Sequence, residues 1–149
     1  MKVVKPPILF FACLIVGGLL HLSWPFEIAP YSFEAGLIAG GACVCAAAAL
    51  GALTIREMKR HETSLEPGQV PARLVTSGPF RFTRNPLYLA QLLFLAGIAL
   101  AVNSAWFLVA AMVQLVLLDR LIVVREEAVI RQKFGTEYVS YVARVRRWI

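Results

Sequence analysis

The chain has few charged residues and is too apolar for an ordinary soluble domain. Only 16% of its 149 residues are Asp, Glu, Lys or Arg, whereas 59% are hydrophobic. Soluble domains are usually about 45–50% apolar. Together with a mean hydropathy of +0.70, this composition indicates an integral membrane protein.

Cysteine is also scarce, and its placement excludes two classes of site. The three cysteines, Cys13, Cys43 and Cys45, all lie inside apolar runs. An odd number of thiols at these positions gives neither a disulfide framework nor the spacing of a metal site. We interpret them as small packing residues and expect no metal.

A net charge of +6 could suggest a nucleic-acid partner, but the distribution of the charge argues against one. The basic residues gather at the ends of apolar runs, as they do in membrane proteins, where they mark the cytoplasmic side. We therefore expect membrane lipids as partners and no nucleic acid.

Four apolar segments are candidates for membrane-spanning helices, which need about 20 apolar residues. They are residues 8–24, 35–55, 87–102 and 105–124, and the break at Asn103-Ser104 makes the last two an antiparallel hairpin. The sequence thus predicts an all-α, polytopic membrane protein with four transmembrane helices, built as a single domain over residues 1–149.

The basic residues also predict the orientation. All fifteen lie before the first span, between the second and third, or at and after the end of the fourth, beginning with Lys2 and Lys5. Both termini and the long middle loop are therefore expected in the cytoplasm. The first apolar run leads into Trp24-Pro25 without a persuasive cleavage site, so we read it as a span and not as a signal peptide.

Small residues in the second span predict close helix packing. Gly36 and Gly40 are spaced four apart, which suits a tight contact with Gly17-Gly18 of the first span. Dimerisation through the same face is the alternative, so a homodimer remains open.

The first polar block, residues 74–88, has the features of an anion-binding helix start. Gly78-Pro79 predicts a turn, Pro86 suits the first helical turn, and Asn85 is the expected N-cap. Arg84 and the free backbone N–H groups could then bind a carboxylate. The alternative is an interfacial Arg-Asn cap followed by a tyrosine, Tyr88, at the membrane boundary.

The second polar block, residues 126–148, follows the fourth span. We expect one helix to continue to Phe134 and to end at Gly135. Asp119 and Glu126 are seven residues apart, hence on one face, so Glu126 is the acid expected to face the site. Glu127 also fits a solvated pair with Arg131 four residues on, and Asp119 with Arg120 fits either a packing pair or part of the pocket.

The last residues, 136–149, predict a short amphipathic helix. Its apolar stripe consists of Tyr138, Tyr141, Val142 and Val145. Such a helix would lie on the membrane surface or fold back over the site as a cap.

In combination, these residues resemble the isoprenylcysteine carboxyl methyltransferase and phospholipid methyltransferase superfamily of integral membrane enzymes. The resemblance covers roughly residues 56–149. The matching residues are Leu74-Val75, Gly78-Pro79-Phe80-Arg81, Arg84-Asn85-Pro86, Tyr88, Glu126-Glu127, Phe134-Gly135, Tyr138, Tyr141 and Arg147-Trp148.

The resemblance implies S-adenosylmethionine as cofactor, in a cytoplasmic pocket capped by the C-terminal helix. Arg84 would bind its carboxylate, Glu126 or Glu127 its ammonium and ribose, and an apolar lining its adenine. The residues expected to bind it are Leu74, Val75, Gly78, Pro79, Phe80, Arg84, Asn85, Pro86, Tyr88 and Glu126; those expected to be catalytic are Arg84, Glu126 and Glu127.

The resemblance further implies a lipid-like or amphiphilic methyl acceptor, of the isoprenylcysteine carboxylate or the phospholipid amine type. Asn85 stands where the eukaryotic carboxyl methyltransferases have His, so we expect a bacterial-type relative in an inner membrane. Two other functions stay open: an NADPH-dependent sterol-reductase-like enzyme, and a non-catalytic lipid-binding scaffold whose basic segments hold anionic headgroups.

Overall fold

The helices of this protein follow its apolar segments. The computed structural model describes residues 5–63 and 72–149, so Lys2 lies outside the described residues. The described residues form helices and no strand. The elements are α1 (Pro6–Ser23), α2 (Phe33–Arg60), the 3-10 turn η1 (Gly78–Arg81), α3 (Pro86–Ala101), α4 (Ala105–Leu117), the π-helix η2 (Leu118–Val123) and α5 (Val124–Val142). The predicted all-α class is confirmed.

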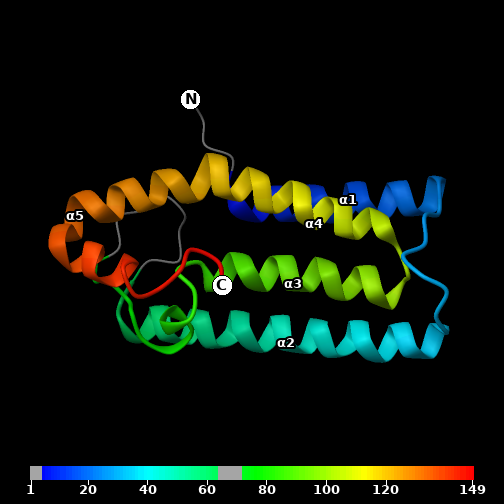
Figure 1. Ribbon diagram of the computed structural model, residues 1–149, viewed down its shortest axis with the longest axis horizontal. Helices are drawn as coiled ribbons and strands as arrows, with labels where there is room; N and C mark the ends of the chain where they lie inside the picture. The colour runs from blue at the N-terminus through cyan, green and yellow to red at the C-terminus, as the bar shows by residue number, and fades with distance from the viewer. Residues whose placement is uncertain (1–4, 64–71) are drawn as a thin grey trace.

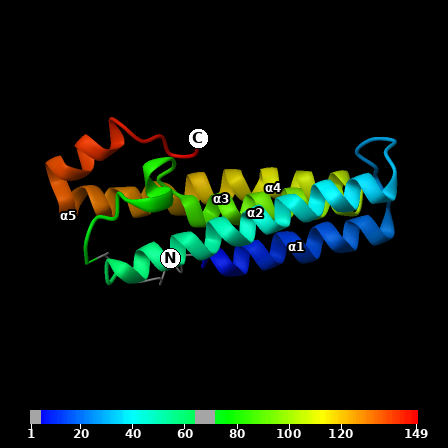
Figure 2. The same cartoon turned by 90° about the horizontal axis from the view of Figure 1, so that it is seen from below.

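The long helices lie side by side in an elongated bundle, and the two polar blocks meet at one of its ends (Figures 1 and 2). Helix α2 packs mainly on α3, α1 packs on α4, and α3 and α4 form the predicted hairpin. Helix α5 extends beyond the start of α3 and then turns back, which brings the C-terminus close to that start (Figure 1).

Within residues 5–63 and 72–149, three helices are long and apolar enough to cross a membrane: α1, α2 and the continuous helix from Ala105 to Val142. Helix α3 is apolar but has only 16 residues, or about 24 Å at 1.5 Å per residue. The hydrocarbon core is about 30 Å thick. The chain is therefore an integral membrane protein with at least three candidate spans, and the fourth span and the orientation remain predictions.

The small-residue face of α2 has a different partner from the one predicted. A Cβ atom added to Gly40 would lie 2.4 Å from the Gly97 carbonyl oxygen of α3, and one added to Gly36 would lie 2.7 Å from that of Leu100. Gly17 of α1 instead faces Phe107 of α4. The expected packing of α2 on α1 through these glycines is wrong, because α3 covers them, and the same cover leaves this face unavailable for a dimer.

The end of the bundle opposite the polar blocks is closed by the α1–α2 connection. Asn103 accepts hydrogen bonds from the backbone N–H groups of Ile28 and Ala29 and donates one to the Ala29 carbonyl oxygen at 2.9 Å. Tyr31 donates to the Leu100 carbonyl oxygen at 2.7 Å. These bonds hold the α3–α4 turn against the connection.

The helix that begins at Ala105 runs through η2 into α5, as predicted, and bends at Gly135. That glycine has φ 51° and ψ −121°, outside the helical region, and a positive φ is a conformation that glycine adopts without steric cost. The helix direction changes there, so the residues after it return toward the bundle (Figure 1). The π-helix between α4 and α5 was not predicted.

Candidate functional site

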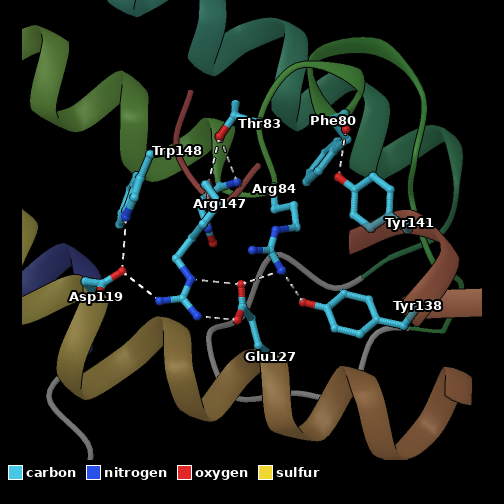
Figure 3. Close-up of polar contacts among 10 residues, drawn as sticks. Phe80, Thr83, Arg84, Asp119, Glu127, Tyr138, Tyr141, Arg147 and Trp148 are labelled. Carbon is cyan, nitrogen blue, oxygen red and sulfur yellow. Dashed lines mark hydrogen bonds and ion pairs between the residues drawn. The ribbon is translucent and has the colours of Figure 1, made fainter. Parts of the chain in front are cut away.

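Arg147 is at the centre of a charged network at the end of the bundle where the polar blocks meet (Figure 3). Its guanidinium donates to both carboxylate oxygens of Glu127, at 3.1 Å from Nε and 2.7 Å from Nη2. Its Nη1 donates to Asp119 at 3.1 Å. Hydrogen bonds to Glu127 are the main cause that raises the pKa of Arg147, with burial opposing them, so this guanidinium is always charged.

Arg84 approaches the same carboxylate from the other side. Its Nη1 lies 3.0 Å from Oε1 of Glu127 and donates to the Tyr138 hydroxyl at 3.3 Å. Its side chain is only 13% exposed. Its Nε is buried and has no hydrogen-bond partner among the described residues. An arginine that holds one carboxylate and retains a buried, unused donor is suited to a further acceptor.

The C-terminal residues are fixed to the start of α3 by their backbone. The Arg147 carbonyl oxygen accepts from Thr83 Oγ1 at 3.1 Å and from Asn85 Nδ2 at 3.0 Å. The Arg84 N–H donates to the Arg146 carbonyl oxygen at 3.1 Å. Asn85 is the N-cap residue, but its side chain does not cap the helix, so the expected role of that side chain is wrong because its amide binds the C-terminal segment.

Trp148 completes this contact on the apolar side. Its indole N–H donates to Asp119 at 3.0 Å, and its ring packs against a buried cluster that contains Tyr88 and Leu118. Asp119 therefore has Arg147 and Trp148 as its close partners, while Arg120 lies at 3.9 Å. Asp119 is therefore part of the charged network, and its contact with Arg120 is the weaker one.

Glu126 lies beside this network with a partner of its own. Its carboxylate accepts a hydrogen bond from the Tyr88 hydroxyl at 2.8 Å. Burial raises the pKa of Glu126 above its ordinary value, and the hydrogen bond from Tyr88 only partly opposes this. Arg84 contacts Glu127 and not Glu126, and the assignment of both Arg84 and Glu126 to one cofactor pocket stays a prediction. The alternative surface pair of Glu127 with Arg131 is replaced by ion pairs with Arg84 and Arg147.

The π-helix η2 explains this exchange of neighbours. In a regular α-helix, residues seven apart share a face, which would align Asp119 with Glu126. A π-helix takes more residues per turn, because its hydrogen bonds join residues five apart. The intervening η2 thus shifts the register so that Glu127, eight residues after Asp119, reaches the same arginine.

The segment after Gly135 packs on the first polar block as the predicted cap would. Tyr138, Tyr141 and Val145 are buried in one cluster, with Leu74 packed against it. The Tyr141 hydroxyl donates to the Phe80 carbonyl oxygen at 2.7 Å, and burial is the main cause that raises the pKa of this phenol. The four predicted stripe residues do pack together, but the helix predicted over residues 136–149 is too long, because α5 ends at Val142 and Val145 lies after it.

The remaining predicted residues do not all lie beside the network. Val75 is buried, and Pro86 occupies the first turn of α3 as expected. Tyr88 belongs to the cluster around Trp148 and not to that around Tyr141, so Leu74 and Tyr88 line different sides. Gly78 has φ 58° and lies against Glu57 of α2. Whether these residues bind a cofactor remains a prediction.

Sequence reasoning gave no role to Thr83, and it included Arg147 and Trp148 in the motif without placing them in the site. A basic and an aromatic residue after an amphipathic helix are common at a membrane surface. Only the return of the chain at Gly135 brings them beside Asp119 and Glu127. The spacing of Asp119 from Glu127 carried no signal without knowledge of the π-helix.

A comparison with protein families identifies the family of the chain. A family model described as phospholipid methyltransferase matches residues 35–137, about two-thirds of the chain. The match includes Arg84, Glu126 and Glu127, and it ends just before Tyr138. No curated protein and no solved structure matches the chain. The predicted resemblance is confirmed, and the chain belongs to the phospholipid methyltransferase family.

Proposed function

We propose that this protein is an S-adenosylmethionine-dependent methyltransferase that acts on a lipid-like acceptor. The observation that supports it most is the meeting of Arg84, Glu127 and Arg147, which come from three distant segments, at the polar end of a membrane bundle. Membership of a methyltransferase family supplies the class of reaction.

The residues at this place fit the cofactor. S-adenosylmethionine presents a carboxylate and an ammonium close together, so it needs a cation and an anion side by side. Arg84 offers the cation, with its unused buried Nε. Glu126 and Glu127, which are neighbours in sequence and both half-buried, offer the anions. When bound, the cofactor would supply an electrophilic methyl group, which passes to the acceptor nucleophile as its bond to the sulfonium sulfur breaks and S-adenosylhomocysteine leaves.

The role of the protein in such a displacement is to position groups and to exclude water. Arg84 would bind the carboxylate, and Glu127, held on both sides by arginines, would keep that guanidinium oriented. Glu126 is the acid without an arginine partner among the described residues, and its carboxylate is held by Tyr88 alone. It is therefore the acid we assign to the ammonium, or to a proton on the acceptor.

The position of the site supports a lipid-like acceptor. The network begins at Asp119, where the apolar helix ends, and Trp148 lies next to the apolar side chains of η2. An acceptor anchored in the bilayer would reach this place laterally, between η2 and the segment 136–149. A water-soluble acceptor would gain nothing from a site at the end of membrane helices.

Titration of the purified, full-length protein in detergent with S-adenosylhomocysteine and with NADPH tests the proposal. We expect saturable binding of S-adenosylhomocysteine, and weaker binding by about 1.5–3 kcal/mol after Arg84→Ala or Glu126→Ala, the range for charged hydrogen bonds. The matched control is Arg144→Ala, because Arg144 is exposed just after α5 and its Nε donates only to the Ser140 carbonyl oxygen four residues before it. Binding of NADPH alone, or of neither compound by a folded protein, would overturn the proposal.

A further inference from the structure

A concave feature lies on the α2 side of η1, and none of the residues of the charged network lines it. It is a groove of about 480 Å³ between the last turns of α2 and the η1 turn, and Figure 1 shows these two segments side by side. This volume is within the range of small-ligand sites. The lining residues are Leu50, Leu53, Arg56, Glu57, Arg60, Gly78, Pro79, Arg81 and Phe82.

The groove carries an excess of positive charge. Three arginines line it, Arg56, Arg60 and Arg81, against one acid, Glu57. Arg56 and Arg81 have no ion-pair partner among the described residues, and the Arg60 pair with Glu57 is long, at 3.7 Å. Glu57 is occupied elsewhere, because its carboxylate accepts from Ser77 Oγ and lies 3.4 Å from His61 Nε2. The arginines are therefore available to an anion.

The apolar part of the same groove faces the region where lipid chains would lie. Leu53 is 52% exposed and Phe82 is 78% exposed, so both side chains offer apolar surface to a lipid chain beside the arginines. Leu53 lies within the predicted second span and Arg56 directly follows that span, so the change from apolar to basic lining occurs at the membrane boundary. Basic pockets beside the cytoplasmic ends of membrane helices suit anionic headgroups.

We infer that this groove binds an anionic phospholipid of the adjacent leaflet. Its phosphate would contact Arg56 and Arg81, with Arg60 close by, and one acyl chain would lie along Leu53 and Phe82. The groove shares Gly78 and Pro79 with the set expected to bind the cofactor, but it contains none of the charged residues proposed to hold it. Arg84 precedes α3, Glu127 lies on α5 and Arg147 lies in the C-terminal segment. The inference does not depend on the proposed methyl transfer.

The test compares lipid binding in four full-length proteins purified in detergent: wild type, Arg56→Gln/Arg81→Gln, Phe82→Ser and Lys59→Gln. Lys59 is the matched control, because it lies in the same last turn of α2, is exposed, and does not line the groove. The probes are a short-chain phosphatidylglycerol, a short-chain phosphatidylcholine and inorganic phosphate. Binding is measured by native mass spectrometry and by the shift in Tm.

We expect phosphatidylglycerol to bind the wild type and Lys59→Gln equally, and the double variant at least tenfold more weakly. Phosphatidylcholine should bind more weakly than phosphatidylglycerol, and Phe82→Ser should lower the affinity for phosphatidylglycerol at least threefold. S-adenosylhomocysteine affinity should be the same in all variants.

Four results would overturn the inference. Equal loss in Lys59→Gln would show diffuse surface charge, and no loss in the double variant would exclude the groove. An equal effect of inorganic phosphate would show an anion site with no role for the acyl chain. A parallel loss of S-adenosylhomocysteine affinity would make the groove part of the cofactor site.

Discussion

Arg147 and Glu127 form an ion pair with two parallel contacts, at 2.7 and 3.1 Å, although twenty residues separate them. The bend at Gly135 makes this possible, because it returns the chain toward the helix from which it departed. The pair joins the C-terminal segment to the helix that carries Glu126 and Glu127. The C-terminal residues are thus an integral part of the candidate site.

Loss of this pair should destabilise the protein. Arg147→Ala removes hydrogen bonds to two carboxylates, those of Glu127 and Asp119. Of the two arginines that contact Glu127, only Arg84 then remains. We expect the free energy of unfolding to fall by about 1.5–3 kcal/mol, the range for charged hydrogen bonds. Arg147→Lys should restore less than half of it, since an ammonium cannot form two parallel bonds. Thermal unfolding in detergent measures both, and a loss no larger than that in Arg144→Ala would contradict the role of the pair.

Two tyrosines allow a separation of stability from cofactor binding. Tyr141 donates to the Phe80 carbonyl oxygen beside the site, and Tyr31 donates to that of Leu100 at the opposite end, both at 2.7 Å. Each change to Phe should cost about 0.5–1.5 kcal/mol of stability, the net value of a hydrogen bond. Only Tyr141→Phe should also weaken the binding of S-adenosylhomocysteine, because the lost hydrogen bond releases η1. Titration calorimetry measures the affinity of both variants for this compound, and equal affinities would show that η1 does not position the cofactor.

Two adjacent glycines of α2 test the packing on α3. A Cβ at position 40 would lie 2.4 and 2.5 Å from backbone atoms of Gly97 and Ala101, whereas one at position 41 has no atom within 4 Å. Gly40→Ala should therefore destabilise by about 1–3 kcal/mol, the cost of overpacking. Gly41→Ala should be neutral or stabilise by up to about 1 kcal/mol through helix propensity. If the two variants unfold at the same temperature, the close contact of α2 with α3 is wrong.

The pH dependence of stability should carry the signature of Glu126. Burial raises the pKa of this carboxyl above its ordinary value of 4.5. The folded state therefore favours the neutral acid, so the stability contributed by this group is present below the ordinary pKa and is lost as the pH rises through the higher, folded value. Glu126→Gln removes this loss. The difference in Tm, wild type minus Glu126→Gln, should fall as the pH is raised from 4 toward 8. A rising difference would contradict a half-buried carboxyl that has a tyrosine and no arginine as its partner among the described residues.

Much of the architecture could be predicted from the sequence, because the length of an apolar run and the proline or glycine that starts or ends a helix are local signals. The apolar runs gave the helices to within a few residues, Pro86 marked the start of α3, and Gly135 marked the bend. The failures concern relations between elements. Which helix covers Gly36 and Gly40 depends on the whole bundle. Which of Glu126 and Glu127 contacts Arg84 depends on the π-helix, and no pattern of residues in the sequence predicts that π-helix.

Methyl transfer itself tests the central claim most directly. The purified full-length protein is incubated with S-adenosylmethionine labelled in its methyl group and with a chloroform extract of bacterial membrane lipids, and the label in the organic phase is counted. We predict label in the lipid fraction that depends on the protein and falls at least tenfold in Arg84→Ala, while Arg144→Ala keeps the wild-type rate. A folded wild-type protein that transfers no label to this fraction, or transfers it equally well after Arg84→Ala, would contradict the account.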